Sequence, residues 1–246
     1  MSTRAELSIV IPAKNEAASL PNLLRSLQQQ DYPHLAHTPV FVADAASTDD
    51  TVAHALSFGG TLKVSVVPGG LPSVGRNRGA ACSDSEFVLF LDADVELRDP
   101  TLLRRAVERM KRARLHCLTV DIVCSDGWWM DRMLYRGNNI MQRLSAWAMP
   151  FGTGMFLLLD RKRFNELGGF NEAAVFAEDF VLTKQISPLR FAVLRGELYT
   201  SNRRFRRTGH GRMVVLFFWT LINSRNRRHF QRDHGYWKEA PLAPVE

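Results

Sequence analysis

The sequence predicts an α/β protein with a doubly wound, mostly parallel sheet. Short apolar runs typical of buried strands alternate with segments of helical periodicity, and several of these runs end on an acidic residue. The clearest run extends from Phe87 to Leu91 and is followed at once by Asp92, Ala93 and Asp94. Ligands of open α/β sheets bind beyond the carboxyl ends of strands, so we expect the functional site at this edge.

The first half of the chain supplies strands and helices in regular alternation. We expect strands at residues 7–13, 39–44, 62–67 and 87–91, and helices at 15–30, 47–58 and around 75–79. Leucines at 20, 23, 24 and 27 share one face of the first helix. The hydroxyl and carboxylate groups of 47–49 are suited to cap the second helix.

The second half is expected to continue the sheet. A basic amphipathic helix follows Pro100 to about Arg114, and we expect strands at 116–124 and 155–159, a long helix at 130–147 and an acid-started helix at 178–186. The Met and Trp stripe of the long helix is interpreted as core, because Met chiefly fills gaps in cores. The glycine turn at 168–170 precedes the last of these helices.

Composition indicates a globular protein of a reducing compartment. Hydrophobic residues make up 46% of the 246 residues, and the three cysteines form no CxxC pair, which argues against a disulfide framework or a zinc site. The N-terminus has no signal-peptide pattern and no apolar run approaches the ~20 residues of a spanning helix. We therefore expect a cytoplasmic protein.

The net charge of +7 is concentrated in the C-terminal part of the chain. From Arg195 to Lys238 there are eleven basic residues and two acidic ones, which predicts an anionic partner. The apolar segment from Met213 to Ile222 is bracketed by arginines and is too short to span a bilayer. It is either buried or lies in a membrane interface. Nucleic acid is not expected, because no recognised binding module accompanies the charge.

Asp92 and Asp94 suggest a metal site. Residues i and i+2 of an extended segment point to the same side, so both carboxylates can face one point beyond the strand. Oxygen ligands of this kind suit Mg²⁺ or Mn²⁺, which keep positions free for water and substrate phosphates. The alternative is an acidic turn after a core strand. Neither the GxGxxG of a dehydrogenase nor the GxxxxGK[ST] of a P-loop is present, which favours phosphates held through a metal.

Five segments in order resemble one known family. They are Ser8-Ile-Val-Ile-Pro-Ala-Lys-Asn-Glu16, Asp44-Ala-Ala-Ser-Thr-Asp49, Gly75-Arg-Asn-Arg-Gly79, Asp92-Ala-Asp94, and Gly168-Gly-Phe-Asn-Glu172 followed by Glu178-Asp179. Together they resemble the inverting nucleotide-sugar glycosyltransferases of family 2, which have the GT-A fold. The likeness covers roughly Leu7 to Ile186. Ala45 and Ala46 depart from the pattern, which puts one polar contact to the nucleotide in doubt.

The resemblance assigns roles to individual residues. It implies a metal on Asp92 and Asp94, Mn²⁺ or Mg²⁺, and a catalytic base at Asp179 with Glu178 as the second candidate. The alternative for that acidic pair is a helix cap. The expected donor-binding residues are Pro12, Ala13, Asn15, Glu16, Asp44, Arg76, Asp92 and Ala93. Candidates for the donor diphosphate are Arg203, Arg204, Arg207 and His210, for which a surface or lipid-facing basic patch is an equal alternative.

The resemblance also implies a function and a division of the chain. We expect an inverting glycosyltransferase that moves a sugar from a nucleoside diphosphate, UDP in the first instance, to an acceptor hydroxyl. The catalytic domain would cover 1–194, with a nucleotide half to about 99 and an acceptor half beyond it, and 195–246 would form a basic extension. A lipid-linked acceptor and an anionic membrane surface are possible partners. The alternatives are a sugar nucleotidyltransferase, which would need a glycine-rich loop after the first strand, and an inactive nucleotide-binding membrane scaffold.

Overall fold

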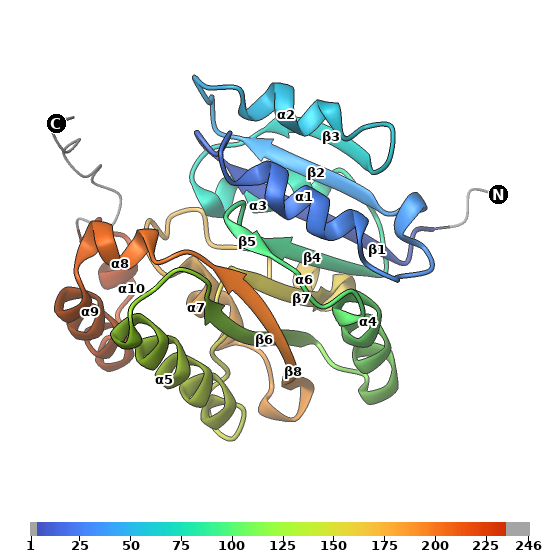
Figure 1. Cartoon of the computed structure of the whole chain (residues 1–246). Helices are drawn as coiled ribbons and strands as arrows, with labels where there is room; N and C mark the ends of the chain where they lie inside the picture. Colours follow the sequence, from blue (N-terminus) through green and yellow to red (C-terminus); the bar gives the residue numbers. More distant parts are fainter. Residues whose placement is uncertain (1–3, 235–246) are drawn as a thin grey trace, which may run out of the picture.

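The computed structural model describes residues 4–234, and its described strands form one sheet through the middle of the molecule (Figure 1). The strands are β1 (Leu7–Ala13), β2 (Pro39–Asp44), β3 (Lys63–Pro68), β4 (Phe87–Leu91), β5 (Val95–Glu96), β6 (Cys117–Cys124), β7 (Phe156–Asp160) and β8 (Phe191–Thr200). The helices are α1 (Leu20–Gln28), α2 (Thr51–Ser57), α3 (Pro72–Ala81), α4 (Leu102–Ala113), α5 (Trp129–Ser145), α6 (Arg161–Glu166), α7 (Glu178–Thr183), α8 (Arg203–Thr208), α9 (His210–Ile222) and α10 (Arg227–Phe230).

The sheet is mostly parallel and has the order β3-β2-β1-β4-β7-β6-β8-β5. The first four strands in that order are parallel, β7 is antiparallel to both β4 and β6, and β8 is parallel to β6. This arrangement confirms the predicted doubly wound α/β class. It brings the carboxyl ends of β1, β2 and β4 to a common edge.

Helices cover both faces of the sheet, which explains why the central strands are apolar without alternation. Ile9 and Ile11 of β1 belong to the core beneath α1 and α4, whereas Val10 belongs to the core beneath α3, α6 and α7. Helix α3 lies very close to β1, because a Cβ on Gly79 would come within 2.4 Å of Val10 Cγ1. The basic segment 75–79 is therefore the inner part of a helix packed on the sheet.

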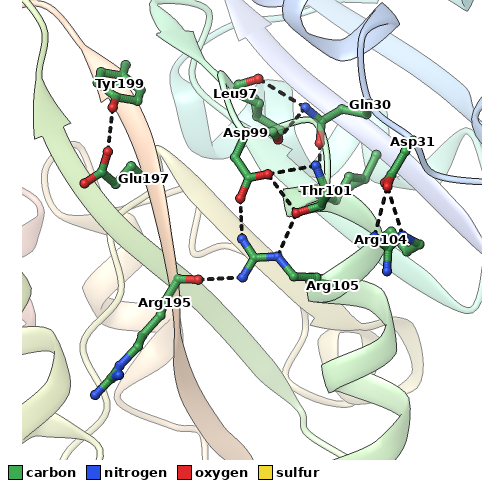
Figure 2. Close-up of polar contacts among 11 residues, drawn as sticks. Gln30, Asp31, Leu97, Asp99, Thr101, Arg104, Arg105, Arg195, Glu197 and Tyr199 are labelled. Carbon is green, nitrogen blue, oxygen red and sulfur yellow. Dashed lines mark hydrogen bonds and ion pairs between the residues drawn. The ribbon is translucent and has the colours of Figure 1, made fainter.

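The segment that follows Asp94 is fixed between α1, α4 and β8 (Figure 2). The amide of Gln30 donates to the carbonyl oxygens of Leu97 and Asp99 at 3.1 and 3.0 Å. Arg105 donates to the hydroxyl of Thr101 at 3.0 Å and to the carbonyl of Arg195 at 2.8 Å. Strand β5, which begins directly after Asp94, pairs with Thr200 and Tyr199 of β8. The acidic turn thus has rigid support on both sides.

Several expectations about the elements were wrong. Helix α1 begins at Leu20 rather than at 15, helix α2 begins at Thr51 rather than at 47, and strands β5 and β8 were not expected. Strand β8 begins with the short apolar run Phe191 to Leu194, but Arg195, Gly196 and Glu197 interrupt it and only three of its ten residues are fully buried. The Met and Trp stripe of α5 is not core: Met133, Ile140, Leu144 and Trp147 are exposed, and the buried positions of this helix are Asp131, Tyr135 and Gln142.

Helix α9 contains the apolar segment 213–222. Its buried side chains are Leu216 and Thr220, whereas Val215, Phe218, Trp219 and Ile222 are exposed. The segment is therefore neither fully buried nor a strand. Within the described chain, none of the helices combines the length and the apolar character needed to cross a membrane.

Candidate active site

The loops that follow β1 and β2 lock together beside the carboxyl end of β4. The backbone N–H of Asn15 donates to Ser47 Oγ at 2.9 Å, and Asn15 Oδ1 accepts from the N–H of Thr48 at 2.9 Å. Asp44 accepts from the N–H of Ser47 at 3.1 Å. Asn15 has a φ of 53°, a left-handed conformation that Asn tolerates better than most residues. Two expected donor-binding residues, Asn15 and Asp44, are thereby held in one rigid loop pair.

Other expected donor-binding residues lie on this same edge. Pro12 and Ala13 end β1, where they pair with Ala43 and Asp44 of β2. Ala13 and Ala93 are both buried. Ala93 lies in the turn between β4 and β5. These small side chains leave their backbone as the only polar surface that a ligand could contact at those positions.

Arg76 is the centre of the site. Its side chain is only 3% exposed and projects from α3 between two carboxylates. Arg76 Nη2 donates to Asp92 Oδ1 at 2.6 Å, and Arg76 also forms an ion pair with Glu178. Burial alone would lower the pKa of Arg76, but Asp92, Glu178 and Asp179 outweigh it and raise that pKa. Arg76 is therefore a permanent buried cation and not a solvated surface charge.

Gly154 makes room for this guanidinium group. A Cβ at residue 154 would lie 2.4 Å from Arg76 Nη2, so no other residue fits without moving the arginine. The N–H of Gly154 donates to Asp179 Oδ2 at 2.7 Å. The sequence Gly152-Thr153-Gly154 directly precedes the strand expected at 155–159, and no role for it was predicted. The sequence signal for this contact was the pair of glycines, Gly152 and Gly154, just before β7, the strand that pairs with β4.

Asp179 is held by two backbone donors, Gly154 N–H and the N–H of Phe180, each at 2.7 Å. Burial, and then the neighbouring charge of Glu178, raise the pKa of Asp179 to about 6, while Arg76 opposes that rise. The residue before α7 is Ala177, which has no side-chain cap bond. Because one oxygen of Asp179 binds a different segment of the chain, capping does not account for this side chain. A carboxylate with a pKa near neutrality suits a general base.

The pKa of Asp179 predicts how activity depends on pH. The carboxylate is the proton-accepting form, and its fraction falls about tenfold per pH unit below the pKa. We expect kcat/KM for sugar transfer to reach a plateau above pH 7 and to decline below about pH 6, the pKa of Asp179. A series of initial rates in buffers of constant ionic strength measures this profile. A plateau that extends unchanged to pH 5 would contradict the assignment.

Arg203 forms a second ion-pair centre at the other end of the acidic turn. Arg203 Nη1 donates to Glu16 Oε2 at 3.0 Å, and Arg203 Nη2 contacts Asp94 Oδ2 at 3.1 Å. Burial raises the pKa of Glu16, and the hydrogen bond and charge of Arg203 oppose that rise. Helix α8, which carries Arg203, thus reaches from the C-terminal part of the chain to the sheet edge.

For the other diphosphate candidates, His210, Arg204 and Arg207, the structure describes no contact with Asp92 or Asp94. His210 Nε2 contacts Asp131 Oδ1 at 2.6 Å, and its ring stacks on Phe205 with centroids 5.4 Å apart. His210 is thus engaged with α5 rather than with Asp92 or Asp94. The side chains of Arg204 and Arg207 lie outside the part of the chain that the structure describes.

Among the residues that the structure describes, Asp92 and Asp94 contact different arginines. They lie in the turn between β4 and β5 rather than in extended backbone, so Asp92 faces Arg76 and Asp94 faces Arg203. The turn, rather than the extended backbone expected from the sequence, sets these directions, and a metal on both carboxylates stays a prediction. The two carboxylates lie two residues apart just beyond a buried strand, each with its side chain 18% exposed.

The charge balance of the site tests whether a divalent metal would fit. Five acids, namely Glu16, Asp92, Asp94, Glu178 and Asp179, are linked through two arginines, Arg76 and Arg203. With only the side chains that the structure describes counted, an anionic diphosphate would meet a net negative site unless a cation accompanied it. Among the described residues, no cluster of three or more His, Cys, Asp or Glu could hold a metal unaided. This fits Mg²⁺ or Mn²⁺ bound by one or two carboxylates together with substrate phosphates.

A sequence model described as glycosyl transferase family 2 matches residues 8–168, which include the strand-end acids described above. The chain belongs to this family. Its matched region covers the sheet edge formed by β1, β2 and β4, and it ends at the glycine turn before Glu178 and Asp179. The resemblance inferred from five short motifs is therefore confirmed at the level of the family.

Curated relatives share part of their length with this chain. It is 32% identical over 187 residues to the 4,4'-diaponeurosporenoate glycosyltransferase of Staphylococcus haemolyticus (strain JCSC1435), covering 74% of this chain and 47% of that protein. It is 27% identical over 187 residues to the GalNAc(5)-diNAcBac-PP-undecaprenol beta-1,3-glucosyltransferase of Campylobacter jejuni (strain ATCC 700819 / NCTC 11168), covering 70% and 58%. The chain thus spans about half the length of these relatives.

Solved structures show the same fold. S. aureus TarS 1–349 in complex with UDP superposes with a TM-score of 0.64 at 21% identity, covering 80% of this chain and 60% of that one. The mannosyltransferase PcManGT from Pyrobaculum calidifontis, in complex with GDP-Man and Mn²⁺, gives 0.68 at 18% identity, covering 98% and 67%. These neighbours confirm the GT-A fold.

Proposed function

We propose that this protein is an inverting glycosyltransferase that moves a sugar from a nucleoside diphosphate sugar to an acceptor hydroxyl. The observation that carries the proposal is one ion-pair network at the carboxyl ends of the strands: Asp92 and Glu178 share Arg76, and Asp179 lies beside them. A carboxylate at this edge can accept the proton of an attacking hydroxyl. Fixed charges beside it can stabilise the charge that develops as an anionic group leaves.

The proposed transfer uses Asp179 as general base. The acceptor hydroxyl attacks the anomeric carbon from the side opposite the leaving group, and Asp179 takes the hydroxyl proton as the new bond forms. The bond to the nucleoside diphosphate breaks with its electron pair left on the phosphate oxygen, so the configuration at the anomeric carbon is inverted. Arg76 holds Glu178 and Asp92 beside the proposed place of transfer, because both carboxylates contact its guanidinium group. Glu178 is thereby a positioning residue.

Asp92 and Asp94 would hold a divalent metal, Mn²⁺ or Mg²⁺, which when bound neutralises charge that develops on the leaving diphosphate. The arginine partners of the two carboxylates differ: Asp94 contacts Arg203, which is 52% exposed, whereas Asp92 contacts the buried Arg76. Arg203, and with it Arg204, Arg207 and His210, belongs to the segment proposed to approach the diphosphate. A divalent ion beside Asp94 would compete with Arg203 and free its guanidinium group for a phosphate.

The donor is proposed to be UDP-linked and to lie against the first two strand ends. Pro12, Ala13, Asn15, Glu16, Asp44 and Ala93 form the surface available to the nucleotide. Support for a uridine nucleotide comes from the fold neighbour TarS, whose structure was solved with UDP. A relative that acts on an undecaprenol-linked substrate supports a lipid-linked acceptor, used at an anionic membrane surface. The proposed division remains 1–194 for the catalytic domain, donor half to about 99, and 195–246 for the extension.

A donor-hydrolysis and product-configuration assay tests this proposal. The purified chain is incubated with UDP-glucose, UDP-N-acetylglucosamine and GDP-mannose in Mn²⁺, and anomeric proton NMR follows the released sugar. We expect one donor to be consumed with the α-linked sugar released first as the β anomer. Retention of configuration would overturn the inverting mechanism. If the folded chain consumes none of the three donors, the proposed transfer from these nucleoside diphosphate sugars would be contradicted.

A further inference from the structure

Helix α5 is amphipathic in an unusual direction, with its polar face buried. Asp131, Tyr135 and Gln142 are its buried residues. The opposite face carries Trp129, Met133, Ile140 and Leu144, which follow one another at intervals of four, seven and four residues. This spacing puts these four side chains on one narrow stripe of the helix, and Trp147 follows in the turn after its end. Met133 and Ile140 are each 57% exposed, and Trp147 is 87% exposed.

The polar face of α5 cannot turn away from the sheet, because its side chains satisfy the backbone of β6. Asn139 donates to the carbonyl of Ile122 and accepts from its N–H, both at 2.9 Å. Gln142 contacts the carbonyl of Val120 at 3.4 Å. The register of β6 against β8 shifts between Val120 and Asp121, where regular ladder bonds are interrupted. The apolar stripe therefore faces outward as a consequence of fixed hydrogen bonds.

Helix α9 presents a second apolar stripe. Val215, Phe218, Trp219 and Ile222 lie at i, i+3, i+4 and i+7 and are all exposed, whereas Leu216 and Thr220 are buried. The starts of the two helices are joined by the contact of His210 with Asp131, and Phe217 packs on Phe151 at 5.5 Å between centroids. Figure 1 shows α5 and α9 at the end of the molecule remote from α2 and β3.

Charge and aromatic content indicate what covers these stripes. From 127 to 159 the only acidic residue is Asp131, which is buried, and Arg132 and Arg136 on α5 are exposed. From 198 to 232 the chain has nine arginines and no acid. Four of its five tryptophans, Trp128, Trp129, Trp147 and Trp219, are exposed on or beside α5 and α9. Apolar stripes that include Trp and have Arg nearby match the boundary between headgroups and acyl chains.

We infer that the exposed faces of α5 and α9 form the surface that docks this protein on an anionic lipid bilayer, with the stripe residues inserted and the arginines at the headgroups. The inference deepens the proposed function, because it names the surface through which the enzyme would reach a lipid-linked acceptor. It differs from attraction by the arginine-rich segment alone, since insertion of apolar side chains persists when salt screens the charges.

Vesicle binding of the full chain tests the inference. Co-sedimentation is measured with phosphatidylcholine vesicles and with vesicles that contain phosphatidylglycerol, at low and high salt and without donor. The test variant is Met133→Glu combined with Ile140→Glu, and the matched control is Leu56→Glu on α2, where the side chain is 56% exposed. We expect the parent chain and the control to bind anionic vesicles and to keep measurable binding at high salt. The double variant should lose at least tenfold in affinity.

Two further readouts separate the possible outcomes. Brominated lipids should quench tryptophan fluorescence in the parent chain and not in the double variant, and the UDP response in Mn²⁺ should be equal in both. Equal vesicle binding by the double variant, or no binding by the parent, overturns the inference. A dimer in size-exclusion chromatography that the double variant abolishes, without vesicle binding, would assign the surface to a second copy of the chain. If the parent chain binds vesicles as expected but shows no response to UDP, the result would count against the proposed function and not against the docking surface.

Discussion

Replacing Asp179 with Asn is expected to lower the rate of sugar transfer by about 10²–10⁴, the range typical of a lost general base. The substitution keeps the size of the side chain but removes the proton acceptor. Asp179 contacts Gly154 and Phe180 N–H groups rather than the acids of the proposed metal site, so donor affinity should change little. Steady-state rates and UDP binding, measured on the same preparation, test both parts. The loss should appear in kcat.

The control for this experiment is Glu178→Gln. Glu178 is bound to Arg76, and the loss of its charge leaves one carboxylate, Asp92, on that arginine. We expect a smaller decrease in transfer, accompanied by weaker donor binding. If Glu178→Gln abolishes transfer while Asp179→Asn leaves it intact, the two roles must be exchanged.

Replacing Arg76 with Met is expected to cost about 3–5 kcal/mol of unfolding free energy, because removing one partner of a buried ion pair leaves the other charges uncompensated. Asp92 and Glu178 both contact Arg76 and are themselves mostly shielded from water. Methionine keeps the aliphatic part of the side chain and removes the charged guanidinium group together with its hydrogen bonds. Urea denaturation gives the difference, and transfer activity should be lost as well.

Arg78 provides a matched control on the same helix. It is exposed and donates to the carbonyl of Gly69 at 2.7 Å. Arg78→Met should change the unfolding free energy by less than about 1 kcal/mol, as is usual for exposed charged residues. Equal losses for the two variants would show that α3 tolerates no change of this kind, and the special role of Arg76 would be withdrawn.

Much of the sheet could be predicted from sequence, because its inner strands are buried on both faces. The residues of β1, β2 and β4 form apolar runs that have no other simple interpretation, and the predicted bounds of β2 and β4 agree with the structure. Strand β8 was missed because Arg195, Gly196 and Glu197 interrupt it after a short apolar run at 191–194. A strand of that composition has no period-2 pattern to detect.

The sequence predicted which residues belong to the candidate site but not which contacts they make with one another. The acids were found because each follows a strand or starts a helix. Their pairing with Arg76 and Arg203 depends on contacts over 102 and 109 residues of chain, which no local pattern encodes. The outward stripe of α5 was misread as core for a related reason: helical spacing identifies one apolar face but cannot say whether that face meets the sheet or the solvent.

Thermal unfolding of the full chain with UDP and GDP, in Mn²⁺ and in EDTA, tests most directly whether Asp92 and Asp94 support metal-dependent nucleotide binding. A ligand at 100 times its Kd adds about 2.7 kcal/mol of stability, and each kcal/mol raises the Tm of a domain of this size by roughly 2–4 °C. We predict that one nucleotide raises Tm strongly in Mn²⁺ and weakly in EDTA, and that Asp94→Ala removes the difference while keeping the Tm of the free protein. An equal rise in Mn²⁺ and EDTA, or an unchanged response in Asp94→Ala, would contradict the account.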